Sequence, residues 1–223
     1  MREHATRGVT GMWKKSEQVL ESRIGLSSFL KSHPNSGSMV VHKGRRLLYM
    51  KAAKTAGTSI LRKTLEPKLG GFIHKKDAPI RFDRWLRRID DAELSRYFIF
   101  AVVRNPYDRF LSMAGYFKMS VEDLIDQYDD LVKKEPYKTH LAPQFNYTHL
   151  GNVQFADRIL RFEKLSDDFS KLMTDLELPD WDLPHENRSD RSSLPLELTG
   201  QHADFVARAY RRDLELYEYE VLR

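Results

Sequence analysis

The sequence predicts a three-layer α/β fold, in which helices cover both faces of a mainly parallel central sheet. Residues 97–103 form a continuous apolar run, YFIFAVV, of the kind found in parallel strands that are covered on both faces. Shorter apolar runs at 47–50 and 159–162 alternate with segments of helical periodicity. Such alternation is typical of an open α/β sheet.

The bulk composition indicates one main domain. The chain has 223 residues, of which 41% are hydrophobic, which is enough for one substantial core. We expect residues 1–36 to form a helical N-terminal extension and residues 37–223 the main domain. No run approaches the roughly 18 apolar residues of a membrane-spanning helix, and the first residues lack the apolar centre of a signal peptide. With no cysteine in the chain, a cytoplasmic location is the default expectation.

The charge balance favours an anionic ligand without naming it. A formal charge of +5 suits a nucleotide, an acidic glycan or a nucleic acid equally well. Basic residues are scattered among acidic ones, and no recognised nucleic-acid motif accompanies them, so we expect no nucleic-acid partner.

The first half of the chain predicts a helix, a hairpin and a buried strand. A helical stretch at 16–30 precedes a cluster of breakers at 32–38. Residues 39–41 and 47–50 flank a polar turn and predict a hairpin whose second strand is central. A loop of small residues follows, and 60–65 predict the next helix.

The second half predicts a crossover helix, a second central strand and a C-terminal helix. Apolar residues from Phe82 to Ile89 repeat at helical spacing. The run 97–103 ends at Arg104, and Pro106 suits the opening position of the following helix. Residues 203–217 predict an amphipathic helix. Four aromatic residues are expected in the core rather than as a base-stacking platform: Tyr107, Phe110, Tyr116 and Phe117.

Two loops with anion-binding chemistry are predicted to meet at one edge of the sheet. Ligands of open α/β sheets bind beyond the carboxyl ends of the strands, where the loops after Ala53 and after Val103 emerge. The first loop offers a lysine, small side chains and hydroxyls directly before a helix, and backbone N–H groups at a helix start attract anions. The residues of this P-loop-like strand, loop and helix are Lys54, Thr55, Ala56, Gly57, Thr58 and Ser59.

The first loop differs from the ordinary nucleotide-triphosphate loop, because its lysine opens the loop instead of standing after the last glycine. A small-residue turn with a solvated lysine remains the alternative. The second loop supplies the planar fork of Arg104 and the hydroxyl of Ser112, which suit a phosphate monoester. Arg104 can also be a structural ion-pair residue, and Arg109 can pair with Asp108 or cap neighbouring backbone.

Together the two loops resemble the sulfotransferase family that uses PAPS, in particular its carbohydrate-type branch with heparan 2-O-sulfotransferase and bacterial relatives. In that family a Lys-Thr-Gly-Gly-Thr-Ser-like loop binds the 5′-phosphosulfate, and an Arg-Asn-Pro segment with a later serine binds the 3′-phosphate. Ala56 stands where glycine is common. The resemblance runs over residues 40–219 and includes 140–144, 161–165 and 210–213.

The resemblance implies sulfuryl transfer from PAPS to a hydroxyl acceptor, a glycan or a small molecule, with PAP as the product and no metal. Lys54 would stabilise the leaving phosphate, and residues 54–59 with Arg104, Ser112 and Arg188 would bind the donor. His74, which resembles the histidine of a His-x-x-x-Ala segment, would be the base, unless it is a surface residue of a basic loop.

Three further residues are candidates for the acceptor side. His140 is the next candidate for the base, although with Gln144 it resembles an acceptor-site residue. Arg84 would guide an anionic acceptor, or it belongs to the solvated face of the crossover helix. The rival functions are a P-loop-type kinase and a nucleotide-binding protein without sulfuryl transfer. The kinase is disfavoured because no Gly-Lys-Ser/Thr and no obvious strand-end aspartate for Mg²⁺ is present.

Overall fold

A five-stranded sheet forms the centre of the protein. The computed structural model describes residues 23–33, 38–179, 183 and 198–222. The strands lie in the order β3-β1-β2-β4-β7, with β1 at Met39–His42, β2 at Leu47–Met50, β3 at Ile73–His74, β4 at Phe98–Val103 and β7 at Arg158–Arg161. β4 is parallel to β2 and to β7, whereas β1 is antiparallel to its two neighbours. Within this sheet, the strands other than β1 therefore run in the same direction, and the predicted mainly parallel sheet is confirmed.

The alternation of side chains along β4 explains its continuous apolar sequence. Phe98, Phe100 and Val102 belong to one hydrophobic cluster, whereas Ile99 and Ala101 belong to a second cluster on the other face. Because successive side chains of a strand point to opposite faces, a strand that is covered on both sides must be apolar at every position.

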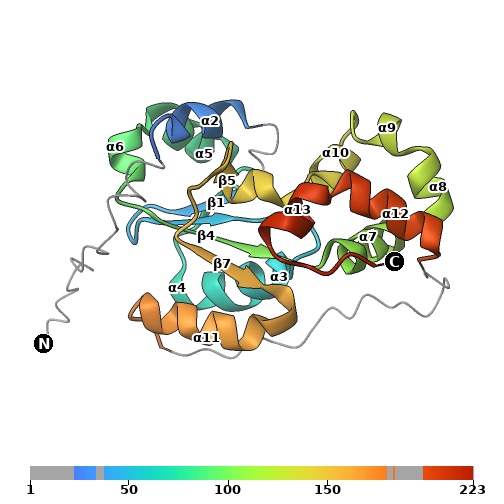
Figure 1. Ribbon diagram of the computed structural model, residues 1–223. Coiled ribbons are helices and arrows are strands. Elements are labelled where there is room, and N and C mark those ends of the chain that lie inside the picture. Colours follow the sequence, from blue (N-terminus) through green and yellow to red (C-terminus); the bar gives the residue numbers. More distant parts are fainter. Residues whose placement is uncertain (1–22, 34–37, 180–182, 184–197, 223) are drawn as a thin grey trace, which may run out of the picture.

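Helices cover both faces of the sheet, as the sequence predicts (Figure 1). One face carries α11 at Leu165–Asp175 and a continuous helix made of α3 at Gly57–Ile60, a π-helical turn at Leu61–Leu65 and α4 at Glu66–Leu69. The other face carries α2 at Leu26–Ser32, α5 at Pro79–Arg88 and α6 at Asp91–Leu94. The predicted crossover helix is α5, and its apolar side chains Phe82, Trp85 and Leu86 are buried.

A third group of helices lies beyond the carboxyl ends of the parallel strands (Figure 1). It contains α7 at Pro106–Phe117, α8 at Val121–Asp126, α9 at Tyr128–Leu131, α10 at Tyr137–Leu141, α12 at Gly200–Ala209 and α13 at Arg211–Leu216. A separate hydrophobic cluster joins these helices. Short elements complete this side of the chain: a 3₁₀ turn at Gln144–Tyr147, β5 at His149–Leu150, β6 at Val153–Gln154 and a 3₁₀ turn at Phe162–Lys164.

The C-terminal segment forms two helices where the sequence predicts one. The break falls at Tyr210, whose backbone leaves the helical region with φ −117° and ψ 26°. The Tyr210 hydroxyl is buried and donates a hydrogen bond to the carbonyl of Leu141 at 2.9 Å. The break thus accompanies a contact between the C-terminal helices and the segment after α10, which helical periodicity does not encode.

No helix among the described residues is long and apolar enough to cross a membrane.

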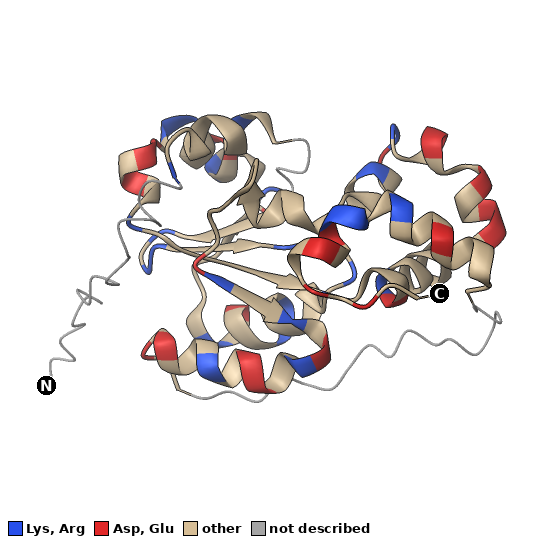
Figure 2. Ribbon diagram, viewed as in Figure 1, with Lys and Arg blue, Asp and Glu red and all other residues tan. Residues whose placement is uncertain are grey.

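Among the described residues, positive charge is not gathered on one face of the protein. Figure 2 shows Lys and Arg on most elements with Asp and Glu between them, as the sequence indicates. The net positive charge therefore does not identify a binding site by itself.

The N-terminal part is anchored by one buried arginine. Of the predicted helical extension, the described residues contain α2 and the turn before it, and the predicted helix at 16–30 otherwise lies outside them. Arg23 is 1% exposed and donates to the carbonyls of Leu94 and Tyr97 at 2.8 Å. Its second terminal nitrogen, Nη2, donates to the Asp157 carboxylate at 2.6 Å, and this carboxylate also accepts the Ile99 N–H at 2.6 Å.

We predict that Asp157→Ala lowers the free energy of unfolding by about 3–5 kcal/mol, because it leaves the Arg23 cation buried without a counter-charge. Asp175→Ala is the matched control. Asp175 pairs with Arg158, but both side chains are about a third exposed, at 30% and 33%, and the expected loss is below about 1 kcal/mol. Urea unfolding measures both; similar losses for the two variants would contradict the account.

Candidate functional site

The largest assembly of predicted site residues surrounds one cavity at the carboxyl ends of β2 and β4. Its volume is about 560 Å³. The parallel pairing of β2 with β4 brings the two following loops to the same edge of the sheet. The cavity is lined by Ser38, Lys51, Ala52, Ala53, Lys54, Ala56, Gly57, Thr58, Lys76, Arg104, Ser112, Tyr116, Thr139, His140 and Phe162.

The loop after β2 turns sharply into α3. Lys54 and Ala56 both have left-handed backbone, with φ 65° and φ 60°. The Thr55 hydroxyl is buried and donates to the Ala52 carbonyl at 2.9 Å, which holds the turn from inside. Ala56 is the N-cap of α3 and supplies no side-chain cap. Because the first N–H groups of a helix have no partner within it, the amides after Ala56 are suited to an anion.

Gly57 leaves room for the side chain of Lys51. A Cβ atom at position 57 would lie 2.6 Å from Lys51 Cδ and 2.7 Å from Lys51 Cγ, far inside normal contact distance. Glycine is therefore needed here for space. The pKa of Lys51 is lowered by burial and by the nearby cations Arg62 and Lys76, so this side of the cavity concentrates positive charge.

Lys54 faces the cavity from the other side of the loop. Its Nζ lies 4.6 Å from the centre of the Tyr116 ring, a cation–π contact. Burial, and to a lesser extent Arg104, lower its pKa. The structure thus brings Lys54 and Arg104 close enough to repel each other, and an anion between them would relieve that repulsion.

The backbone of Arg104 is held on both sides by the side chain of Gln144. The Arg104 N–H donates to Gln144 Oε1 at 2.8 Å, and Gln144 Nε2 donates to the Arg104 carbonyl at 2.8 Å. Gln144 is held in turn by Asp213, which accepts the Gln144 N–H at 2.7 Å and the Phe145 N–H at 2.8 Å. Burial raises the pKa of Asp213. The guanidinium of Arg104 lies over the Phe162 ring at 4.2 Å.

Arg109 caps backbone instead of pairing with Asp108, which is one of the two roles that the sequence leaves open. Its side chain is fully buried. It donates to the carbonyl of Ala53 at 3.1 Å and to those of His140 and Ala142 at 2.7 Å each. Arg109 therefore connects the loop after β2 to the end of α10 and fixes the width of the cavity between them.

The sequence-based expectation for Tyr116 is wrong. The sequence places it in the core with Tyr107 and Phe110, and these two residues are buried. Tyr116 itself is 54% exposed and lines the cavity. Its ring stacks on that of His140, with centroids 4.8 Å apart and an interplanar angle of 13°. Helical periodicity places Tyr116 next to the apolar stripe of α7, and only the packing of α10 against α7 shows which way it faces.

Several predicted site residues do not line the cavity. Thr55 and Ser59 are buried beneath the loop, and Gln144 is fully buried behind Arg104. His74 lies on β3 at 6% exposure, so it is not the surface residue of a basic loop that the sequence leaves as the alternative. Arg188 lies outside the described residues.

Arg84 is far from the cavity. It is exposed on α5 and lines another groove with Lys43 and Tyr97, at the amino ends of β2 and β4. Lys54 and Arg104 stand at the carboxyl ends of the same strands. β4 has six residues and is about 20 Å long, so the two sites lie at opposite edges of the sheet.

Sequence reasoning missed part of the cavity. The loop predicted to hold the 5′-phosphosulfate runs from Lys51 to Ser59, but Lys51 is given no separate role within it, although the lysine stands directly at the end of β2. Lys76, Thr139 and Phe162 reach the cavity from segments that are distant in sequence. Phe162 lies in the segment 161–165 that shares in the resemblance, but the sequence gives none of the three a role at the site.

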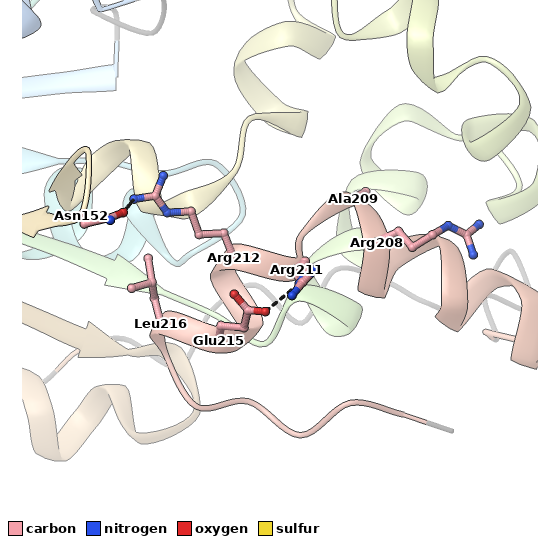
Figure 3. Close-up of a pocket in the computed structure, with 7 residues that line it drawn as sticks. All are labelled: Asn152, Arg208, Ala209, Arg211, Arg212, Glu215 and Leu216. Atoms are coloured by element: carbon pink, nitrogen blue, oxygen red, sulfur yellow. Dashed lines mark hydrogen bonds and ion pairs between the residues drawn. The ribbon is translucent and has the colours of Figure 1, made fainter.

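A second hollow of about 620 Å³ lies on α12 and α13 (Figure 3). The arginines that line this hollow contact different partners. Arg211 pairs with Glu215 at 2.7 Å, and Arg212 donates to Asn152 at 2.9 Å, while Arg208 points away from both in Figure 3. Because these cations do not converge, we do not regard this hollow as the functional site.

The fold and the cavity define an α/β protein with a cation-lined cavity at the carboxyl edge of its sheet. The family model described as "Sulfotransferase family" matches residues 38–220, and the chain belongs to this family. It is thus a transferase of the sulfotransferase type. No curated protein and no solved structure gives a significant match.

We predict that Gln144→Leu lowers the free energy of unfolding by about 2–4 kcal/mol. The variant keeps a side chain of similar size but leaves the buried N–H and C=O of Arg104 without their partners, at about 1–3 kcal/mol each. Gln154→Leu, at an exposed position of β6, is the control and should change stability by less than about 1 kcal/mol. Urea unfolding gives both values, and a Gln144→Leu variant as stable as the control would contradict the described role.

Proposed function

We propose that the protein transfers a sulfuryl group from PAPS to the hydroxyl of an acceptor, a carbohydrate or a small molecule, and releases PAP. One observation carries the proposal: of the four cations among the described residues that line the cavity, Lys54 stands at a helix start and Arg104, with Ser112 also in the lining, stands on the loop and helix after the neighbouring parallel strand. PAPS carries two separate anionic groups, the 5′-phosphosulfate and the 3′-phosphate. Membership of the sulfotransferase family supports the assignment.

The 5′-phosphosulfate would lie against the start of α3. The amides of Gly57 and Thr58 and the Thr58 hydroxyl would hold it, with Lys54 beside the oxygen that bridges phosphorus and sulfur. As that bond breaks, charge develops on the leaving phosphate, and a fixed cation in a partly dry cavity stabilises it. Positioning and electrostatics carry such a transfer, as they do for phosphoryl groups.

The 3′-phosphate would contact Arg104 and Ser112. Arg104 is 9% exposed and its backbone is clamped by Gln144. Its guanidinium donates to the Lys54 carbonyl at 3.4 Å and lies over the Phe162 ring, so its direction is set before a ligand arrives. An arginine fork binds a phosphate through two parallel hydrogen bonds. A further contact from Arg188 remains part of the proposal, as does the assignment to the carbohydrate-type branch.

The lining argues against the kinase alternative. A nucleotide triphosphate reacts as its Mg²⁺ complex, and the metal is usually held by a carboxylate. Among the described residues that line the cavity there is no Asp or Glu. A nucleotide-binding protein without sulfuryl transfer remains the second candidate, and turnover alone separates it from the first.

We predict that PAP raises the melting temperature by about 5–10 °C at a hundredfold excess over its dissociation constant, and that ATP with Mg²⁺ does not. Arg104→Lys keeps the charge but loses the fork, so it should weaken PAP at least tenfold and leave adenosine 5′-phosphate, which lacks the 3′-phosphate, within about twofold. Thermal shift and calorimetric titration measure these effects. Stabilisation by ATP–Mg²⁺ with none by PAP would refute the proposal.

We further predict that Lys54→Ala lowers the rate of transfer of labelled sulfuryl from PAPS by about 10²–10³-fold, because the leaving phosphate loses its cation. Lys68→Ala, an exposed residue at the end of α4, is the matched control and should not change the rate. A Lys54→Ala variant with an undiminished rate would assign the charge stabilisation to another group.

Gly57→Ala tests the packing of Lys51. The new methyl group must displace the Lys51 side chain, so we expect PAP affinity to fall at least tenfold and the free energy of unfolding to fall by about 1–3 kcal/mol. Calorimetric titration with PAP and urea unfolding separate the two quantities. Unchanged affinity would show that Lys51 does not contribute to donor binding.

A further inference from the structure

The two histidines that the sequence offers as the base, His140 and His74, differ in their position relative to the donor cavity and in their hydrogen bonds. His140 lines the cavity, with its ring stacked on Tyr116, whose face also contacts the Lys54 ammonium. The imidazole and the ammonium therefore share one aromatic neighbour at one wall of the cavity. His74 is buried on β3 and does not line the cavity.

The hydrogen bonds of His140 define which of its ring nitrogens carries the proton. Nδ1 lies 2.9 Å from the carbonyl oxygen of Pro136. A carbonyl oxygen only accepts, so Nδ1 is the donor and, in the neutral ring, Nε2 keeps its lone pair. No described residue provides a hydrogen-bond partner for Nε2. His140 thus offers an unoccupied proton acceptor in a ring that forms part of the cavity wall.

The shorter of two contacts at His74 Nδ1 favours the opposite tautomer. The backbone N–H of Lys76 lies 3.3 Å from Nδ1 and donates to it, whereas the Asp77 carboxylate lies 3.5 Å away and is shared with Arg62. With the Lys76 bond made, the lone pair of Nδ1 in the neutral ring is in use and Nε2 carries the proton. His74 Nε2 is buried and has no partner among the described residues. In this arrangement His74 has no free lone pair to offer a substrate.

We propose that Nε2 of His140 is the base that takes the proton of the acceptor hydroxyl in the transfer reaction. The inference rests on the proposed function. The acceptor oxygen attacks sulfur and forms the new S–O bond, while the bond from sulfur to the bridging oxygen breaks and its electron pair leaves with the phosphate of PAP. The hydroxyl proton passes to His140, which becomes an imidazolium and releases the proton to water before the next cycle.

Burial and the charges around His140 favour its neutral form in the free protein. Burial lowers its pKa, the hydrogen bond to Pro136 opposes this, and Lys54 and Lys51 from the loop and Arg109 from α7 lower the pKa further. Tyr116 faces it from α7 as a neutral ring. The donor's anions offset these cations, so donor binding raises the pKa of His140 and makes it a stronger base when the acceptor is to be activated.

The tautomers can be measured without any acceptor. Nitrogen-15 NMR of the full chain with PAP bound, at a pH above both histidine transitions, distinguishes the protonated from the unprotonated ring nitrogen. We expect the Nδ1–H form for His140 and the Nε2–H form for His74, each assigned by comparison with its His→Gln variant. The reverse pair of tautomers would overturn the proposal.

The kinetic test uses labelled PAPS with water, the simplest hydroxyl acceptor, and with p-nitrophenol, whose proton is far more acidic. His140→Gln retains a donor for Pro136 and should bind PAP within about threefold of the parent. The rate of sulfuryl transfer from PAPS to water should fall at least a hundredfold in this variant, and the rate should no longer decline when the pH falls below the pKa of the histidine. The rate of transfer to p-nitrophenol should fall much less, because this acceptor loses its proton without a base. His202→Gln is the matched control with an unchanged rate, because glutamine also suits the third position of the α12 capping box.

The possible outcomes distinguish a wrong donor site from a wrong base. If the unmutated protein does not bind PAP, the proposed donor site is wrong. Normal PAP binding, with the low-pH decline retained in His140→Gln and lost in His74→Gln, would leave the donor site intact and assign the base to His74. Normal PAP binding with the decline lost only in His140→Gln is the result we expect.

Discussion

The buried hydrogen-bonded unit of Gln144 and Asp213 is the constraint on which the site depends. The amide of Gln144 occupies both backbone groups of Arg104, and Asp213 accepts from the backbone of residues 144 and 145. This unit joins the end of β4, the segment after α10 and the C-terminal helix α13. Because an unpaired buried polar group costs about 1–3 kcal/mol, each of the three segments holds the others in place. The direction of Arg104 is therefore a property of the whole carboxyl edge of the sheet.

The loop after β2 stores strain that this frame supports. Left-handed backbone at two residues with side chains, Lys54 and Ala56, costs about 1–2 kcal/mol each. Thr55 anchors the loop from below, and Arg109 binds the carbonyl of Ala53. In return, the first amides of α3 and the Lys54 ammonium face one cavity. Strained backbone of this kind is typical of ligand sites, where a rigid surrounding keeps it in place.

Much of the fold follows from local sequence patterns, whereas the walls of the cavity do not. The apolar run at 97–103 and the strand-loop-helix order after Met50 predict the two strands and the edge at which their loops meet. Tyr116 was expected in the core and the C-terminal helix was expected to be continuous, because periodicity describes one element at a time. The direction of the Tyr116 side chain depends on its contact with His140 of α10. The break between α12 and α13 at Tyr210 accompanies the hydrogen bond from its hydroxyl to the Leu141 carbonyl. Arg84 shows the same limit, since a basic helix face does not reveal which end of the sheet it is near.

The most direct test of the account is a crystal structure of the protein with PAP. We predict that the 5′-phosphate lies against the amides of Gly57 and Thr58 with Lys54 beside it. The 3′-phosphate should contact Arg104 and Ser112, with the hydrogen bonds between Gln144 and Arg104 unchanged. PAP with its two phosphates exchanged between these positions, or bound instead at the arginines of α12 and α13, would contradict the account.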